Sequence, residues 1–135
     1  MQENARLSFS ALGRQVGLSG PAVAERLHKL EELEIIAGYH ADVNPAAIGY
    51  GVSAFIRLTA PTEKYPRVLE LAQRLPEIRE CHHVTGSEAF ILKILTTSIP
   101  ELESLIAQLS TFGATSTAIV LSSPVRKHQL EAVDS

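Results

Sequence analysis

Three adjacent residues, Cys81, His82 and His83, carry side chains that can bind a metal or form a nucleophilic pair. Thiolate and imidazole are zinc ligands, and a histidine beside a cysteine can activate the thiol. On an extended strand, however, Cys81 and His83 share one face and His82 points to the other. Two ligands per chain are too few for a metal, and neighbouring strand residues diverge too far to form a dyad. We therefore expect histidines at an interface, with no metal site, no cofactor and no catalytic residue.

The turn that follows these residues suits a small anion. It offers backbone amides and short hydroxyls, which can hold a carboxylate group. The candidate residues for binding a small molecule are His83, Thr85, Gly86, Ser87, Glu88 and Ala89. A plain hairpin turn is the alternative, because glycine is expected in such a turn in any case.

The stretch GLSGPAVAERL reads as the end of one helix, a tight corner and the start of a second helix. The corner of a helix-turn-helix needs a backbone conformation that glycine tolerates best, and Gly17 occupies it. Ser19 suits the N-cap of the second helix, and Pro21 suits its first turn. Val23 and Leu27 are expected to face inward. A helical hairpin with a purely structural role is the alternative.

The charge around this corner is locally positive. Residues 6–29 hold four basic residues against Glu25, a net +3, although the first half of the chain carries four basic and six acidic residues and the whole chain has a net charge of −3. Phosphate contacts depend on local charge, so Arg14, Arg26 and Lys29 are candidate phosphate ligands.

Direct reading of bases by this second helix is expected to be limited. The residues predicted to face the DNA groove are Ser19, Gly20, Pro21, Ala24, Glu25 and His28. Only Ser19, Glu25 and His28 among them can hydrogen-bond to a base edge. We therefore expect specificity to depend largely on DNA shape and bending.

The elements that position these residues change character near residue 50. Before it, apolar residues recur at helical spacing; after it, alternating stretches predict strands at about 51–59, 78–85, 88–96 and 114–122, and helices at about 64–75 and 98–110. The order βαββαβ is ferredoxin-like. The predicted class is α+β: a helix-turn-helix (winged-helix-like) domain over 1–43, a linker over 44–50, and a ferredoxin-like domain with a C-terminal tail over 51–135.

The third predicted strand, AFILKIL, is apolar on both faces. Phe90, Leu92 and Ile94 lie on one side, and Ile91 and Leu95 lie on the other. Since both helices cover the same face of such a sheet, the second face needs another cover. We expect a second copy of the chain to supply it, sheet to sheet; the alternative is that the N-terminal helices fold back over the sheet.

Composition narrows the class of protein further. Hydrophobic residues make up 45% and charged residues 20%, which is typical of a globular protein and not of a disordered chain. There is no apolar run long enough to cross a membrane and no visible export signal. The single cysteine is typical of a reducing compartment, so we expect a cytoplasmic protein.

The stretch from QENARL to NPAAIGYG, with ECHHVTGSEAFILKI and TSTAIVLSS further on, resembles the Lrp/AsnC family of feast/famine transcription regulators. The resemblance covers nearly the whole chain. It implies a DNA-binding helix-turn-helix and a βαββαβ domain that dimerises and assembles into tetramers or octamers. It also implies an effector, often an amino acid, that binds between dimers near the turn after Val84.

Two departures from the family pattern are visible. Family members carry a further helix before QENARL, so we expect this chain to lack that first helix and part of the cover over its N-terminal apolar residues. The family turn often carries Asp shortly after its glycine, where this chain has Ser87, Glu88 and Ala89. A carboxylate for a ligand ammonium is therefore missing or is supplied by Glu88.

Three functions follow from these patterns. The leading interpretation is a transcription regulator that binds double-stranded DNA and responds to a small molecule. The second is a small-molecule sensor or enzyme-regulatory subunit that does not bind DNA. The third, an enzyme on the ferredoxin-like fold, lacks a convergent acid–base set in the sequence.

Overall fold

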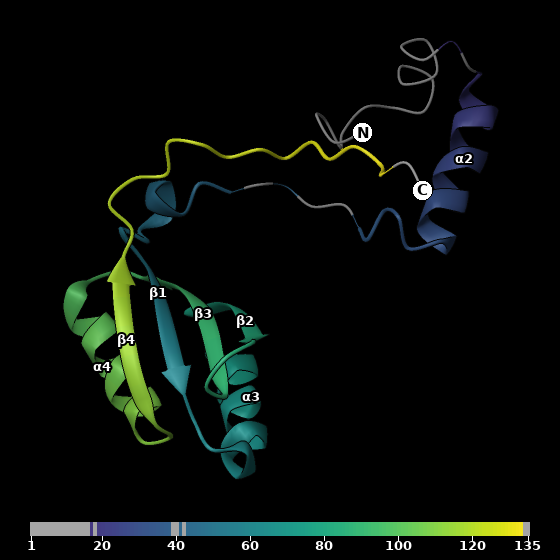
Figure 1. The fold of residues 1–135 in the computed structure, drawn as a ribbon. Helices are drawn as coiled ribbons and strands as arrows, with labels where there is room; N and C mark the ends of the chain where they lie inside the picture. Colours follow the sequence, from purple (N-terminus) through teal and green to yellow (C-terminus); the bar gives the residue numbers. More distant parts are fainter. Residues whose placement is uncertain (1–16, 18, 39–40, 42, 134–135) are drawn as a thin grey trace. The chain divides into compact units, whose positions relative to one another are not determined.

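The protein, seen here as a computed structural model, is described for residues 17, 19–38, 41 and 43–133 (Figure 1). It divides into two compact units, one of Met1–Val43 with Val125–Ser135, the other of Asn44–Pro124. Among the described residues, no helix is long and apolar enough to cross a membrane. The predicted contact residue Arg14 lies outside the described residues.

The second helix of the predicted helix-turn-helix is α2, Gly20–Glu32. Ser19 caps it, its hydroxyl accepting a hydrogen bond from the Ala22 N–H at 3.3 Å. Gly17 has φ +76°, the left-handed conformation predicted for the corner. Val23 and Leu27 are the buried residues of the helix. The cap, the glycine corner and the inward face are therefore confirmed.

The C-terminal end of α2 is a Schellman motif with an unusual residue. The Ile35 N–H donates to the Leu30 carbonyl at 2.8 Å, and the Glu34 N–H donates to the Glu31 carbonyl at 3.0 Å. Glu34 holds the left-handed position, with φ +58°. The helix therefore ends before Leu33, which is 61% exposed and does not continue the inward apolar row.

A short 3₁₀ helix, η1 (Pro45–Ile48), lies within the predicted linker. The Asn44 side chain caps it by accepting from the Ala46 N–H at 3.2 Å. Gly49 then adopts φ +104°, a left-handed value that favours glycine. The predicted linker thus has regular local structure.

The second unit is a four-stranded antiparallel sheet in the order β2-β3-β1-β4, with two α-helices. Its elements are β1 (Val52–Thr59), η2 (Thr62–Lys64), α3 (Tyr65–Arg74), β2 (Ile78–Val84), β3 (Ala89–Thr96), α4 (Ile99–Ser110) and β4 (Ala114–Ile119). Ser98 caps α4, accepting from the Glu101 N–H at 3.3 Å. The βαββαβ order and the ferredoxin-like class are confirmed, with element ends within three residues of the prediction.

The core of this unit lies between one face of the sheet and the two helices. Strands contribute alternate residues, and helices contribute one row each. The buried set is Ala54, Ile56, Leu58, Ala60, Val68, Leu71, Ile78, Phe90, Leu92, Ile94, Leu102, Leu105 and Leu109. Burial of each large aliphatic side chain stabilises the fold by about 1.5–3 kcal/mol. Both helices therefore cover the same face, as predicted, and α3 and α4 lie behind the sheet in Figure 1.

The opposite face of the sheet is less well covered within the chain. Because Ala54, Ile56 and Leu58 face the helices, Phe55 points to the other side, where it is 44% exposed. On β3, Ile91 and Leu95 lie on this same outer face and are half-buried. We call Phe55, Ile91 and Leu95 the outer apolar strip.

Candidate DNA-binding helix and effector turn

The outward side of α2 carries the residues predicted to meet DNA. Pro21, Glu25, Arg26, His28 and Lys29 are exposed, as is the cap Ser19, while Gly20 and Ala24 are half-buried. Most of the predicted contact residues of α2 are therefore exposed to solvent, and none belongs to the buried pair Val23 and Leu27.

The electrostatics of this helix are mixed. His28 Nδ1 lies 3.9 Å from Glu31 Oε2, one helical turn further on. Over 19–38 the basic residues are two, Arg26 and Lys29, and the acidic residues are four, so this stretch has a net charge of −2. Positive charge for phosphates is thus concentrated on two side chains, next to an acidic helix end.

The turn between β2 and β3 has a left-handed backbone over three successive residues. Gly86 has φ +86°, Ser87 +39° and Glu88 +47°. The Glu88 carbonyl accepts from the Ala60 N–H at 3.3 Å, and Glu88 Oε1 accepts from the Thr62 hydroxyl at 3.2 Å. The loop after β1 therefore holds this strained turn in place, and the Glu88 carboxylate is directed toward Thr62.

Two residues predicted for the effector site lie away from the turn surface. Ala89 is fully buried, at 0% exposure, so it supports the turn from below and offers no surface to a ligand. His83 faces the helix side of the sheet, where its Nε2 lies 3.2 Å from the Tyr65 hydroxyl oxygen. Its ring stacks on Phe90 with centroids 5.0 Å apart, and Tyr65 meets both rings edge-on.

The sequence did not single out Tyr65, although it lies at this cluster. Desolvation and the nearby Glu88 carboxylate raise the pKa of its phenol, while a hydrogen bond with Thr62 acts in the opposite direction. Tyr65 therefore remains a neutral hydroxyl beside His83. The strand period placed Cys81 and His83 on one face of the strand but did not say which face the helices cover.

Arg57 is the second residue that sequence reasoning missed. It lies half-buried on the outer face of β1, paired with Ile91 of β3. A Cβ built on Gly86 would lie 3.9 Å from its Nη2, so the guanidinium reaches the turn. The turn therefore has a carboxylate, Glu88, and a cation, Arg57, within its immediate surroundings.

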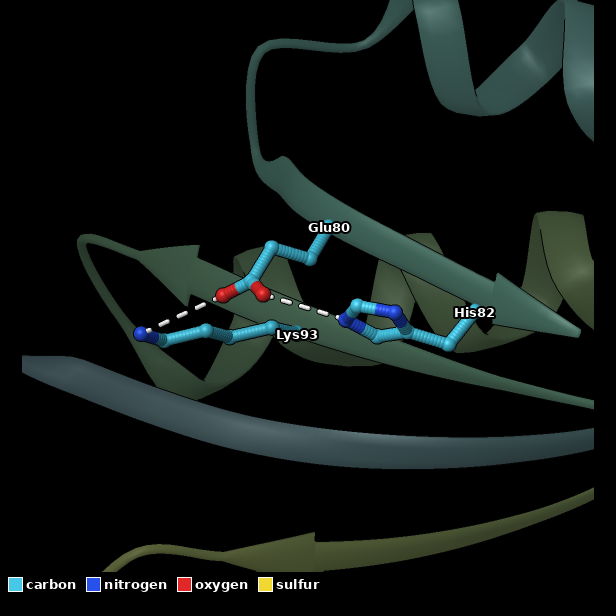
Figure 2. A network of polar contacts seen from close by, with 3 residues as sticks. All are labelled: Glu80, His82 and Lys93. Atoms are coloured by element: carbon cyan, nitrogen blue, oxygen red, sulfur yellow. Dashed lines mark hydrogen bonds and ion pairs between the residues drawn. The ribbon is translucent and has the colours of Figure 1, made fainter. Parts of the chain in front are cut away.

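The adjacent cysteine and histidines diverge as the strand period predicted. Cys81 packs against the core, and burial raises the pKa of its thiol. His82 lies on the outer face, where its Nε2 is 3.0 Å from Glu80 Oε1, while Lys93 Nζ is 3.5 Å from Glu80 Oε2 (Figure 2). The hydrogen bond with His82 is the main cause that lowers the pKa of Glu80, helped by Lys93. Within the described part of the chain, no three potential ligands gather as a metal site.

Known proteins match both halves of this arrangement. An AsnC-type helix-turn-helix domain matches residues 1–31, and the Lrp/AsnC ligand binding domain matches residues 53–130. The chain belongs to the Lrp/AsnC family of transcriptional regulators. The family prediction is thereby confirmed, and the relatives are regulators and not enzymes, as predicted.

Individual relatives span most of the chain. The HTH-type transcriptional regulator LrpC of Bacillus subtilis is 33% identical over 122 residues, covering 90% of this chain and 85% of LrpC. Its solved structure superposes with a TM-score of 0.88, covering 93% of this chain and 90% of that one. The regulatory protein AsnC of Escherichia coli is 33% identical over 129 residues, covering 92% of this chain and 85% of AsnC. The feast or famine regulatory protein of Mycobacterium tuberculosis was solved in complex with L-methionine. It has 30% identity and a TM-score of 0.83, covering 96% of this chain and 90% of that one.

Proposed function

We propose that this regulator binds double-stranded DNA through α2 and that a small molecule, an amino acid, modulates the binding from the β2–β3 turn. The observation that carries the DNA part is the capped α2 with its glycine corner, which coincides with the AsnC-type helix-turn-helix match. The proposed domains are 1–43 for DNA binding, 44–50 as linker, and 51–135 for dimerisation and effector binding with a C-terminal tail, whose residues 125–135 group with the first unit. Its proposed place of action is the cytoplasm.

The DNA contacts are divided between phosphates and bases. Arg14, Arg26 and Lys29 contact phosphates and set the register of the helix. Ser19, Glu25 and His28 hydrogen-bond to base edges, and Gly20, Pro21 and Ala24 allow close approach. The acidic end of α2 limits non-specific attraction, which leaves a larger share of the discrimination to DNA shape.

The effector site is the turn residues Thr85, Gly86, Ser87 and Glu88, with His83 beneath one side. Support comes from the held, left-handed backbone of the turn and from the L-methionine complex of the M. tuberculosis relative. Glu88 is the carboxylate available for a ligand ammonium. Ala89 positions the turn from the core.

A second copy of the chain covers the outer apolar strip in this proposal. Phe55 is the most exposed member, and Ile91 and Leu95 are only partly covered within the chain. A sheet-to-sheet dimer buries this strip and places two copies of α2 for DNA half-sites one or more helical turns apart. Dimers then assemble into tetramers or octamers, with the effector between dimers.

Two measurements on the full chain test the proposal. Gel shifts with genomic DNA fragments are expected to show salt-sensitive binding. A thermal-shift screen of the amino acids is expected to show stabilisation by at least one, about 2.7 kcal/mol at a concentration of 100 times its Kd. Glu88→Gln should abolish this shift, while Glu80→Gln on the same sheet should keep it. Stabilisation without any DNA binding would favour the alternative function, a sensor or enzyme-regulatory subunit.

A further inference from the structure

We propose that the basic stretch Arg126–Lys127–His128 of the C-terminal tail is a second phosphate-binding element, used together with α2 on the same DNA. The inference rests on the proposed DNA binding and adds a contact site outside the helix-turn-helix. The starting observation is the division of the chain: Val125–Ser135 belongs to the compact unit of Met1–Val43, not to the sheet unit. The tail residues therefore group with the unit that contains α2.

The sequence concentrates positive charge at this point. Arg126 and Lys127 are the only neighbouring pair of Lys or Arg residues in all 135 residues, and His128 follows directly. Elsewhere the basic residues are isolated along the chain. A guanidinium binds phosphate oxygens in a bidentate manner, and an ammonium adds a mobile point charge.

The structure leaves these side chains open to solvent. Arg126, Lys127 and His128 are all exposed, and residues 120–133 form no helix or strand. Within the described residues, no ion pair involves Arg126 or Lys127. Their charges are thus not neutralised by a described carboxylate and remain available to an external anion.

Positive charge is sparse in the sequence of this unit. Met1–Val43 has four basic and six acidic residues, and Val125–Ser135 has two of each, so the positive charge of the tail is confined to its start at Arg126 and Lys127. Binding to DNA is largely driven by release of counterions as phosphates are neutralised, with a log–log salt slope of about −0.9 per phosphate contact. A two-cation segment in the same unit as α2 raises affinity for any DNA sequence without adding base readout.

The test is the salt dependence of DNA binding by the full chain carrying Arg126→Ala and Lys127→Ala together. The probe is a mixed-sequence DNA duplex titrated at several salt concentrations between about 50 and 200 mM. The slope of log Kobs against log salt should become shallower by about 1.8 for each protomer bound, and affinity at 0.1 M salt should fall by up to about 60-fold per protomer. The ratio of affinities between two different duplexes should not change.

Three controls make the result specific. Arg67→Ala with Arg74→Ala removes two exposed cations from α3 in the sheet unit and should leave the slope unchanged. Exchange of the pair (Arg126→Lys, Lys127→Arg) retains the charge and should restore binding. Sedimentation must show the same oligomer for all variants, so that a change in assembly does not imitate a lost contact.

The outcomes separate this inference from the function on which it rests. If the unmodified chain binds DNA and the Arg126/Lys127 variant keeps its slope and affinity, the tail is not a phosphate-binding element and the α2 proposal stands. If the unmodified chain binds no DNA, both proposals fail. If the α3 control weakens binding equally, the effect reflects net charge, and the tail assignment is overturned.

Discussion

A Cβ atom placed on Gly113 would lie 1.9 Å from the carbonyl oxygen of Thr59 and 3.1 Å from the Cα of Ala60. The chain between α4 and β4 therefore passes directly against the end of β1, at a distance that only glycine permits. Gly113 stands between the end of α4 and the start of β4. Its role is the close approach of two backbone segments.

Gly113→Ala is therefore expected to destabilise the sheet unit by about 2 kcal/mol or more. The reason is that the atoms in the way belong to the backbone of Thr59 and Ala60 and not to a flexible side chain. Urea unfolding followed by circular dichroism measures the change. Gly51→Ala is the matched control, because a Cβ at Gly51 meets nothing within 4 Å. Equal stability of the two variants would contradict the close approach.

Substitutions at two positions that flank α2 are expected to have opposite effects on the stability of the helical unit. Gly17 and Glu34 both adopt left-handed backbone, but only one of them is glycine. Left-handed φ costs a residue with a side chain about 1–2 kcal/mol, so Gly17→Ala should destabilise the helical unit by about 1 kcal/mol. Glu34→Gly should stabilise it by about 0.5–1 kcal/mol, because it removes that strain from the Schellman motif.

Amide hydrogen exchange of α2 reports both changes. Glu32→Gly, inside the last turn of the same helix, is the control and should destabilise by about 1 kcal/mol through helix propensity alone. A destabilised Glu34→Gly variant would argue against the left-handed assignment of that residue.

The Glu80 carboxylate on the outer face leads to a prediction about the stability of the fold at low pH. Its pKa is lowered below the ordinary value of 4.5, chiefly by the hydrogen bond with His82. A group whose folded-state pKa is depressed contributes stability above its unfolded pKa, and this contribution is lost as the pH falls through the lower, folded value. Glu80→Gln should therefore cost up to about 1 kcal/mol at neutral pH, a small amount because the pair is exposed. The cost should begin to fall as the pH drops below 4.5 and should vanish only below the lower, folded-state pKa.

Urea unfolding at neutral and acidic pH tests this dependence. Glu70→Gln, which removes an exposed carboxylate of α3, serves as the control for the loss of one negative charge. A constant difference between Glu80→Gln and the unmodified chain at both pH values would refute the electrostatic origin.

The proposed DNA contacts of α2 lead to two measurable effects, one on the affinity for DNA and one on the preference among DNA sequences. Arg26→Ala should weaken binding to all DNA sequences and make the salt slope shallower by about 0.9 per protomer. Glu25→Ala should change sequence preference modestly, because few side chains on the exposed surface of α2 reach base edges. Competition binding against a pool of randomised duplexes separates the two. Complete loss of discrimination in Glu25→Ala would show that direct readout dominates over DNA shape.

Local patterns in the sequence predict most of the fold. Apolar alternation and helix caps located all four strands and both helices of the sheet unit, because these signals act over a few residues. Ser19 and Pro21 marked the start of α2 correctly, since a cap depends on residues next to it in the chain. The strand period also separated Cys81 from His82.

The surroundings of the effector turn could not be predicted in the same way. The approach of Arg57 to Gly86 requires the register that pairs Arg57 with Ile91, which no local pattern specifies. The contact between Tyr65 and His83 joins residues 18 apart in the chain and depends on how α3 packs on the sheet. Burial of Ala89 likewise follows from tertiary packing, so the sequence placed it at a surface that it does not reach.

The chain enters and leaves the sheet unit through neighbouring strands. β1 follows the linker and β4 precedes the tail, and the two strands pair side by side, with the Val120 N–H donating to the Ser53 carbonyl at 2.8 Å. In topological terms the sheet unit is an insertion in the helical unit, joined to it through the start of β1 and through the end of the edge strand β4. The start of β1 and the end of β4 therefore lie at the same end of one antiparallel strand pair, so both covalent connections to the other unit begin there.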